Sequence, residues 1–104
     1  MKNDAKIWLA NRARQTALAL IGEGNDYTAA ERYSYMASGH VDSHTKWSSS
    51  RYEAAGILLA FREHYGSSAR QKIADLLDRH FHEFIGSYGP MMEATRQMAE
   101  LTGN

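Results

Sequence analysis

The chain has 104 residues, about the size of one ordinary domain, so a two-domain enzyme is excluded. Lys plus Arg and Asp plus Glu each number 12, and this zero formal net charge disfavours both a basic nucleic-acid binder and an acidic DNA mimic. Cysteine is absent, which excludes disulfides, thiolate nucleophiles and zinc sites built on cysteine. We therefore expect one folded domain over residues 1–104.

The first two predicted helices are separated by a glycine-containing turn. The first helix is predicted to begin after Asn3 or Asp4 and to run to Ile21, before the turn Gly22-Glu23-Gly24-Asn25. Its apolar stripe consists of Leu9, Ala13, Ala17 and Leu20. The second helix is predicted to open at Thr28-Ala29-Ala30-Glu31, which has the form of a capping box, and to end near Ser38.

A third helix is predicted from a second capping box, Ser50-Arg51-Tyr52-Glu53, to Tyr65. It is apolar on nearly every face and is therefore expected to be the buried centre of the fold. Gly56 in its interior costs about 1 kcal/mol relative to Ala, which predicts a close helix crossing at that position as compensation.

Two further helices complete the prediction. A third box, Ser68-Ala69-Arg70-Gln71, opens an amphipathic helix, and Pro90 is suited to the first position of the last helix. The apolar positions of the first of these are Ile73, Leu76, Leu77, His80, Phe81, Phe84 and Ile85. The fold class is therefore predicted as all-α, a compact bundle of about five short helices. Its core is predicted to contain Leu58, Phe61, Leu77 and Phe81.

Metal binding and catalysis find little support in the motifs. His40, Asp42 and His44 would project to one side of an extended strand and could hold zinc, nickel or ferrous iron, but neither a fourth ligand nor a second shell can be named. His80 and His82 point about 200° apart on a helix and cannot share an ion. Nucleophile and phosphate-loop motifs are missing from the sequence. We expect no enzyme, no cofactor and no tight metal site; a His-based metal-binding or haem-binding bundle is the second alternative.

A DNA-binding helix-turn-helix is the first alternative. The Tyr65-Gly66-Ser67-Ser68 junction is followed by Arg70, Gln71 and Lys72, residue types that read bases and phosphates. Asp75 and Asp78 lie further along the same predicted helix and would meet the phosphates with like charge. An ordinary capped bundle helix is favoured, and duplex DNA binding is expected to be weak.

The segment from Glu31 to Glu53 has the composition of a binding surface, with tyrosine, tryptophan and arginine among many serines. Tyr33 and Tyr35 cannot share one helix face, so at least one of them is expected to face solvent or a partner. The predicted partner-binding residues are Tyr33, Tyr35, His40, His44, Trp47 and Arg51. The competing interpretation is that these rings pack over a loop as a second small core.

The function expected from these patterns is that of a small non-enzymatic adaptor or inhibitor that binds a protein partner. An accessory protein of a phage or mobile element would fit this size and composition. The first and last helices could also pair copies of the chain as a homo-oligomer. No uninterrupted apolar run indicates a signal peptide or a membrane span, and we expect a cytoplasmic protein.

Overall fold

The computed structural model describes residues 3–37, 49–79 and 96, and within these ranges all regular structure is helical. The elements are α1 (Asn3–Gly22), α2 (Asp26–Ala37), α3 (Ser49–Tyr65), the short 3₁₀ helix η1 (Gly66–Ser68) and α4 (Ala69–Asp78). The predicted all-α class is confirmed. The described ranges hold four α-helices, and the helix predicted from Pro90 lies outside them.

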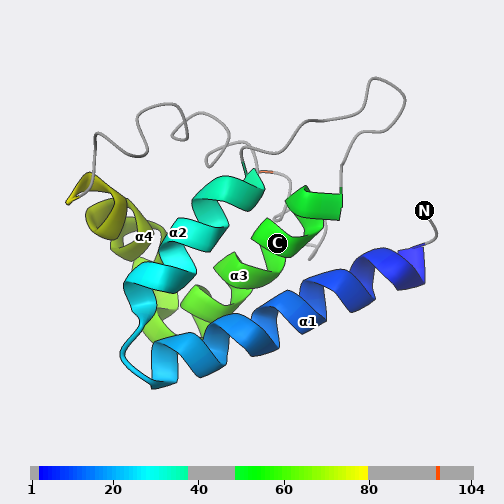
Figure 1. Cartoon of the computed structure of the whole chain (residues 1–104), viewed down its shortest axis with the longest axis horizontal. Helices are drawn as coiled ribbons and strands as arrows, with labels where there is room; N and C mark the ends of the chain where they lie inside the picture. The colour runs from blue at the N-terminus through cyan, green and yellow to red at the C-terminus, as the bar shows by residue number, and fades with distance from the viewer. Residues whose placement is uncertain (1–2, 38–48, 80–95, 97–104) are drawn as a thin grey trace.

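The predicted central position of α3 is confirmed, because this helix packs against α1, α2 and α4 (Figure 1). Helix α1 runs along one edge of the molecule with α3 beside it, and α2 and α4 lie on the other side of α3. Leu58 and Phe61 of α3 are fully buried, as expected for a helix that is covered on most of its faces.

The close crossing predicted at Gly56 is also confirmed, and its partner is the backbone of α1. A Cβ atom at position 56 would lie 2.8 Å from the carbonyl carbon of Ala10 and 3.0 Å from its Cα, and closer still to its carbonyl oxygen. Atoms of a neighbouring backbone cannot rotate away as a side chain can. Glycine at 56 and alanine at 10 therefore set how near α1 lies to α3.

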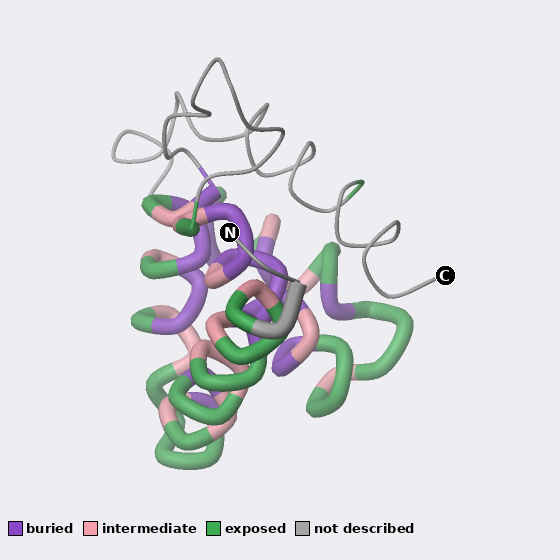
Figure 2. Tube along the Cα trace, turned by 90° about the vertical axis from the view of Figure 1, so that its right-hand side faces the viewer, coloured by how far each residue is buried: buried purple, intermediate pink, exposed green. Residues whose placement is uncertain are grey.

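The apolar side chains of the four helices form one core cluster. Figure 2 marks the buried residues of the chain in purple. Leu58, Phe61 and Leu77 are members, as predicted, whereas Phe81 lies outside the described residues. From α1 the buried residues are Ala10, Ala17 and Ile21, with Ala13 and Leu20 of the predicted stripe partly buried. The face of α1 that packs on the core is thus rich in alanine, which permits the close approach to α3.

The predicted starts of α2 and α3 are displaced from their capping boxes. Helix α2 begins at Asp26, two residues before Thr28, and its first turn is closed by the Ala29 N–H, which donates to the Asn25 carbonyl oxygen at 3.2 Å. The Asp26 Oδ1 accepts a hydrogen bond from the backbone N–H of Tyr27 at 3.0 Å. Helix α3 begins at Ser49, so that Ser50 already lies inside its first turn. Thr28 is likewise a helical residue of α2, and it does not start the helix.

The capping box predicted at Ser68 is wrong for a different reason. The 3₁₀ helix η1 leads directly into α4, and the Ser68 hydroxyl donates to the carbonyl oxygen of Tyr65 at 2.8 Å instead of capping α4. Gln71, the other end of the predicted box, donates from Nε2 to Asp75 Oδ1 at 2.7 Å. Both side chains are therefore occupied elsewhere, while the 3₁₀ turn continues into the first turn of the helix.

Asp26 ties three helices together at the end of the molecule where α1 turns into α2. Its Oδ2 accepts a hydrogen bond from the Tyr65 hydroxyl at 3.1 Å and lies 3.6 Å from the Lys72 Nζ. The same ammonium group lies 5.2 Å from the centroid of the Tyr65 ring. Burial, followed by the hydrogen bond to Asp26 and its negative charge, raises the pKa of the Tyr65 hydroxyl above its ordinary value.

Candidate partner-binding surface

The two tyrosines of α2 lie on opposite sides of the helix, as the sequence predicts. Tyr35 is 61% exposed, whereas Tyr33 is fully buried in the core between Ala30 and Ala37 along the buried face of α2. Tyr35 therefore remains a candidate contact. Tyr33 does not, because a ring without solvent-accessible surface cannot touch a partner while the core is intact; its i±4 spacing from Ala29 and Ala37 was the sequence signal for this.

Arg51 is likewise not a surface anchor. Its side chain lies on the buried face of α3, one turn from Ala54 and Ala55, and the residue is only 8% exposed. Its Nε and Nη1 are buried and have no hydrogen-bond partner in the described part of the chain. The other predicted contacts, His40, His44 and Trp47, lie outside the described residues.

An exposed surface that the sequence analysis missed lies near the start of α1. Ile7 and Trp8 are 50% and 57% exposed, and with Tyr35 they are the large apolar residues that the described helices leave in solvent. The Arg12 guanidinium lies over the Trp8 ring, 5.3 Å from its centroid, in a cation–π arrangement. The spacing in the sequence could have indicated that Trp8 is exposed, because it shares a helix face with the polar residues Asn11, Arg12 and Gln15.

Beside this surface a hollow opens between α1, α2 and α3. Its lining consists of Leu9, Arg12, Ala13 and Thr16 of α1, Arg32 of α2 and Glu53 of α3. Arg32 Nη2 lies 3.8 Å from Glu53 Oε2, and Arg32 is half-exposed, so the ion pair is loose and solvated. Arg12 and Arg32 thus lie on two sides of the hollow, and Glu53, the one carboxylate in its lining, is already paired with Arg32.

The two exposed rings, Trp8 and Tyr35, lie toward the same end of the molecule. Helices α1 and α2 run in opposite directions from their connecting turn, so Trp8, one turn before Arg12, and Tyr35, one turn after Arg32, both lie beyond the hollow as seen from that turn. We call Trp8, Arg12, Arg32 and Tyr35 the aromatic–arginine surface. Tryptophan, tyrosine and arginine are the residue types that most often dominate the binding energy of protein interfaces.

The chemistry available on the aromatic–arginine surface is recognition. Arginine forks and aromatic faces bind carboxylates, backbone carbonyls and apolar side chains. Across residues 3–37 and 49–79 no group of three His, Cys, Asp or Glu side chains is placed to hold a metal ion. The His40, Asp42 and His44 cluster falls outside these ranges.

Two side chains that a DNA-reading helix would use at the α3–η1–α4 junction already interact within the protein. Gln71 is bonded to Asp75, and Lys72 lies beside Asp26 and over Tyr65. Arg70 is exposed. Asp75 and Asp78 are exposed on the same helix, as the sequence predicted.

No helix in the described part of the chain has the length and apolar character needed to cross a membrane. Comparison of the chain with family models, with curated proteins and with solved structures finds no match.

Proposed function

We propose that this protein is a small non-enzymatic binding module, of adaptor or inhibitor type, which binds a protein partner through the aromatic–arginine surface. The observation that carries the proposal is the exposed Trp8 ring with the Arg12 guanidinium stacked on it. Burying an exposed tryptophan against a partner is favourable because of its large apolar area, and the stacked arginine adds a directional polar contact.

Of the predicted contact residues, Tyr35 is part of this surface, and His40, His44 and Trp47, which lie outside the described residues, stay predictions. Tyr35 belongs to the predicted segment and is exposed, whereas Trp8 and Arg12 extend the surface onto α1. The helix-turn-helix alternative has less support, since Gln71 and Lys72 are engaged within the protein. A role as an accessory protein of a phage or mobile element, and a cytoplasmic location, remain part of this proposal and rest on the size and composition of the chain.

The proposal is tested by affinity capture from the native host with the wild-type chain, Trp8→Ala and Gln15→Ala. Gln15 is exposed on the same face of α1 but lacks the ring, so it is the matched control. A protein captured by wild type and Gln15→Ala, and lost with Trp8→Ala, is then measured by calorimetry with purified components. We expect Trp8→Ala to weaken binding by about 2 kcal/mol or more.

A partner that binds Trp8→Ala and Tyr35→Ala as tightly as wild type would place the interface elsewhere and contradict the proposal. Sedimentation of the purified chain separates a foreign partner from a second copy. Self-association that disappears in Trp8→Ala would assign the aromatic–arginine surface to a homo-oligomer.

A further inference from the structure

The first turn of α3 contains a buried positive charge without a counterion in the described part of the chain. Arg51 is 8% exposed, and its Nε and Nη1 are buried without hydrogen-bond partners there. An arginine keeps its charge in a protein, so its burial without an anion is unfavourable. An anion that reached the guanidinium would remove this cost.

The helix itself adds to the positive potential at this point. Arg51 is the third residue of the 17-residue helix α3, and the backbone N–H groups of a helix's first turn have no acceptors within the helix. These groups carry the positive end of the helix dipole. Side chains on a helix lean toward its N-terminus, which brings the Arg51 guanidinium over this same turn.

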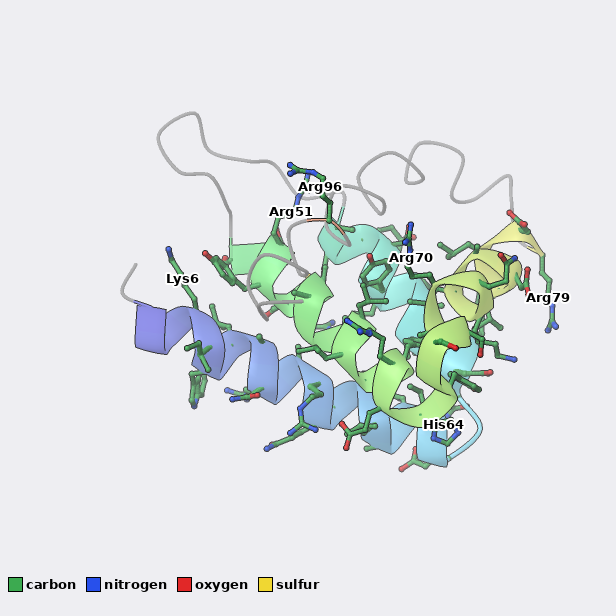
Figure 3. All side chains as sticks on the ribbon, turned by 180° about the vertical axis from the view of Figure 1, so that it is seen from behind. Lys6, Arg51, His64, Arg70, Arg79 and Arg96 are labelled. Carbon is green, nitrogen blue, oxygen red and sulfur yellow. The ribbon has the colours of Figure 1, made fainter. Side chains whose placement is uncertain are left out.

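Nearby charges reinforce the preference for an anion. Lys6 of α1 lies over the ring of Tyr52, the residue after Arg51, with Nζ 5.4 Å from the ring centroid. Figure 3 shows the Lys6 and Arg51 side chains extending on the same side of the molecule. Glu53 lies about 200° around α3 from Arg51 and pairs with Arg32, so it does not neutralise Arg51.

We propose that the first turn of α3 binds an oxyanion, a carboxylate or a phosphate group, against the guanidinium of Arg51. Guanidinium N–H groups and the N–H groups of a helix N-terminus both donate to such oxygens, and both are found together where proteins bind phosphate or carboxylate groups. The site is separate from the aromatic–arginine surface, and it does not depend on the proposed function.

The test uses sodium phosphate and sodium acetate as probes, each compared with sodium chloride at equal ionic strength. Thermal unfolding is followed for the wild-type chain, for Arg51→Met and for Arg62→Met, which removes an exposed arginine from the same helix. We expect at least one oxyanion to raise the melting temperature of wild type and Arg62→Met. Its apparent affinity for Arg51→Met should be at least about tenfold weaker. A response to phosphate alone or to acetate alone identifies which anion the site takes.

A second measurement does not depend on the folding of Arg51→Met. Titration of the wild-type protein with each anion should shift the amide resonances of Ser49, Ser50 and Arg51 but not those of Ala69 and Arg70, which begin α4 without a buried arginine. Equal shifts at both helix starts, an unchanged melting temperature of wild type, or an equal response from Arg51→Met would overturn the proposal.

Discussion

Single positions determine how closely α1 and α3 approach each other. At position 56 the space that a Cβ would need is occupied by the Ala10 backbone, while at Gly22, near the end of α1, a Cβ would meet nothing within 4 Å. The two glycines lie in helices, and neither has a positive φ angle. Their substitution by alanine therefore separates the steric effect from the general preference of helices for alanine.

We expect Gly56→Ala to lower the free energy of unfolding by about 1–3 kcal/mol, because overpacking against a backbone outweighs the better helix propensity of alanine. Gly22→Ala should be neutral or stabilising by up to about 1 kcal/mol. Urea unfolding of both variants provides the measurement. If Gly56→Ala is as stable as Gly22→Ala, the helix crossing is looser than described.

Tyr33 and Tyr35 offer a second comparison at the scale of the residue. Truncating the fully buried Tyr33 to alanine should cost about 3–5 kcal/mol of stability, as for other large aromatic core residues. Tyr35→Ala, on the exposed side, should change stability by at most about 0.5 kcal/mol. Chemical denaturation measures both, and similar losses in the two variants would contradict the assignment of Tyr35 to a binding surface.

At the scale of the helix, Asp26 couples the start of α2 to the end of α3 and to α4. Below pH 10.0, the ordinary pKa of tyrosine, the Tyr65 hydroxyl is protonated in both the folded and the unfolded chain. Above it the unfolded chain loses this proton first, because burial and the Asp26 carboxylate raise the pKa in the folded state. The stabilisation is thus complete below the unfolded pKa and is lost as the pH rises through the folded value.

Tyr65→Phe tests this coupling. At neutral pH the variant should lose about 1 kcal/mol of stability with the hydrogen bond to Asp26. As the pH rises above 10.0, wild-type stability should fall more steeply than that of Tyr65→Phe. Denaturant unfolding at a series of alkaline pH values gives the difference between the two curves, and parallel curves would mean that Tyr65 is not coupled to folding.

The helices themselves could be predicted from sequence better than their first residues. Apolar periodicity places Leu58, Phe61 and Leu77 correctly, because burial is decided by the whole helix face. A capping box is a local pattern, and the hydrogen bonds that it predicts are not formed in two cases. Helix α2 already begins at Asp26, before Thr28. Helix α4 does begin directly after Ser68, but the Ser68 hydroxyl donates to Tyr65 instead of capping it.

The candidate surface was predicted only in part, because the packing of the helices on one another decides which residues are exposed. Composition identified Tyr35 but also Tyr33 and Arg51, since residue type alone does not say which side of a helix meets the core. Trp8 was missed because it lies outside the predicted apolar stripe of its helix, of which Ala13, Ala17 and Leu20 pack on the core. Only the packing of α1 on α3 shows that its outer face has no covering helix among the described elements.

At the scale of the whole molecule, the zero net charge predicts weak binding to duplex DNA at physiological salt, since few counterions would be released. Fluorescence anisotropy with labelled duplexes should show no sub-micromolar binding, and Arg70→Ala should change nothing. A tight specific site that is weakened by Arg70→Ala without loss of helicity would favour the helix-turn-helix alternative.

The tight crossing of Ala10 and Gly56 also affects how the molecule meets a partner. Ala10 lies only two residues beyond Trp8, so the backbone that carries the exposed ring is clamped to the central helix. Association normally loses free energy when flexible interface segments become ordered. Here that ordering is completed during folding, and the ring is presented from a rigid base. A loosened crossing should therefore reduce partner affinity even where no contact residue has changed.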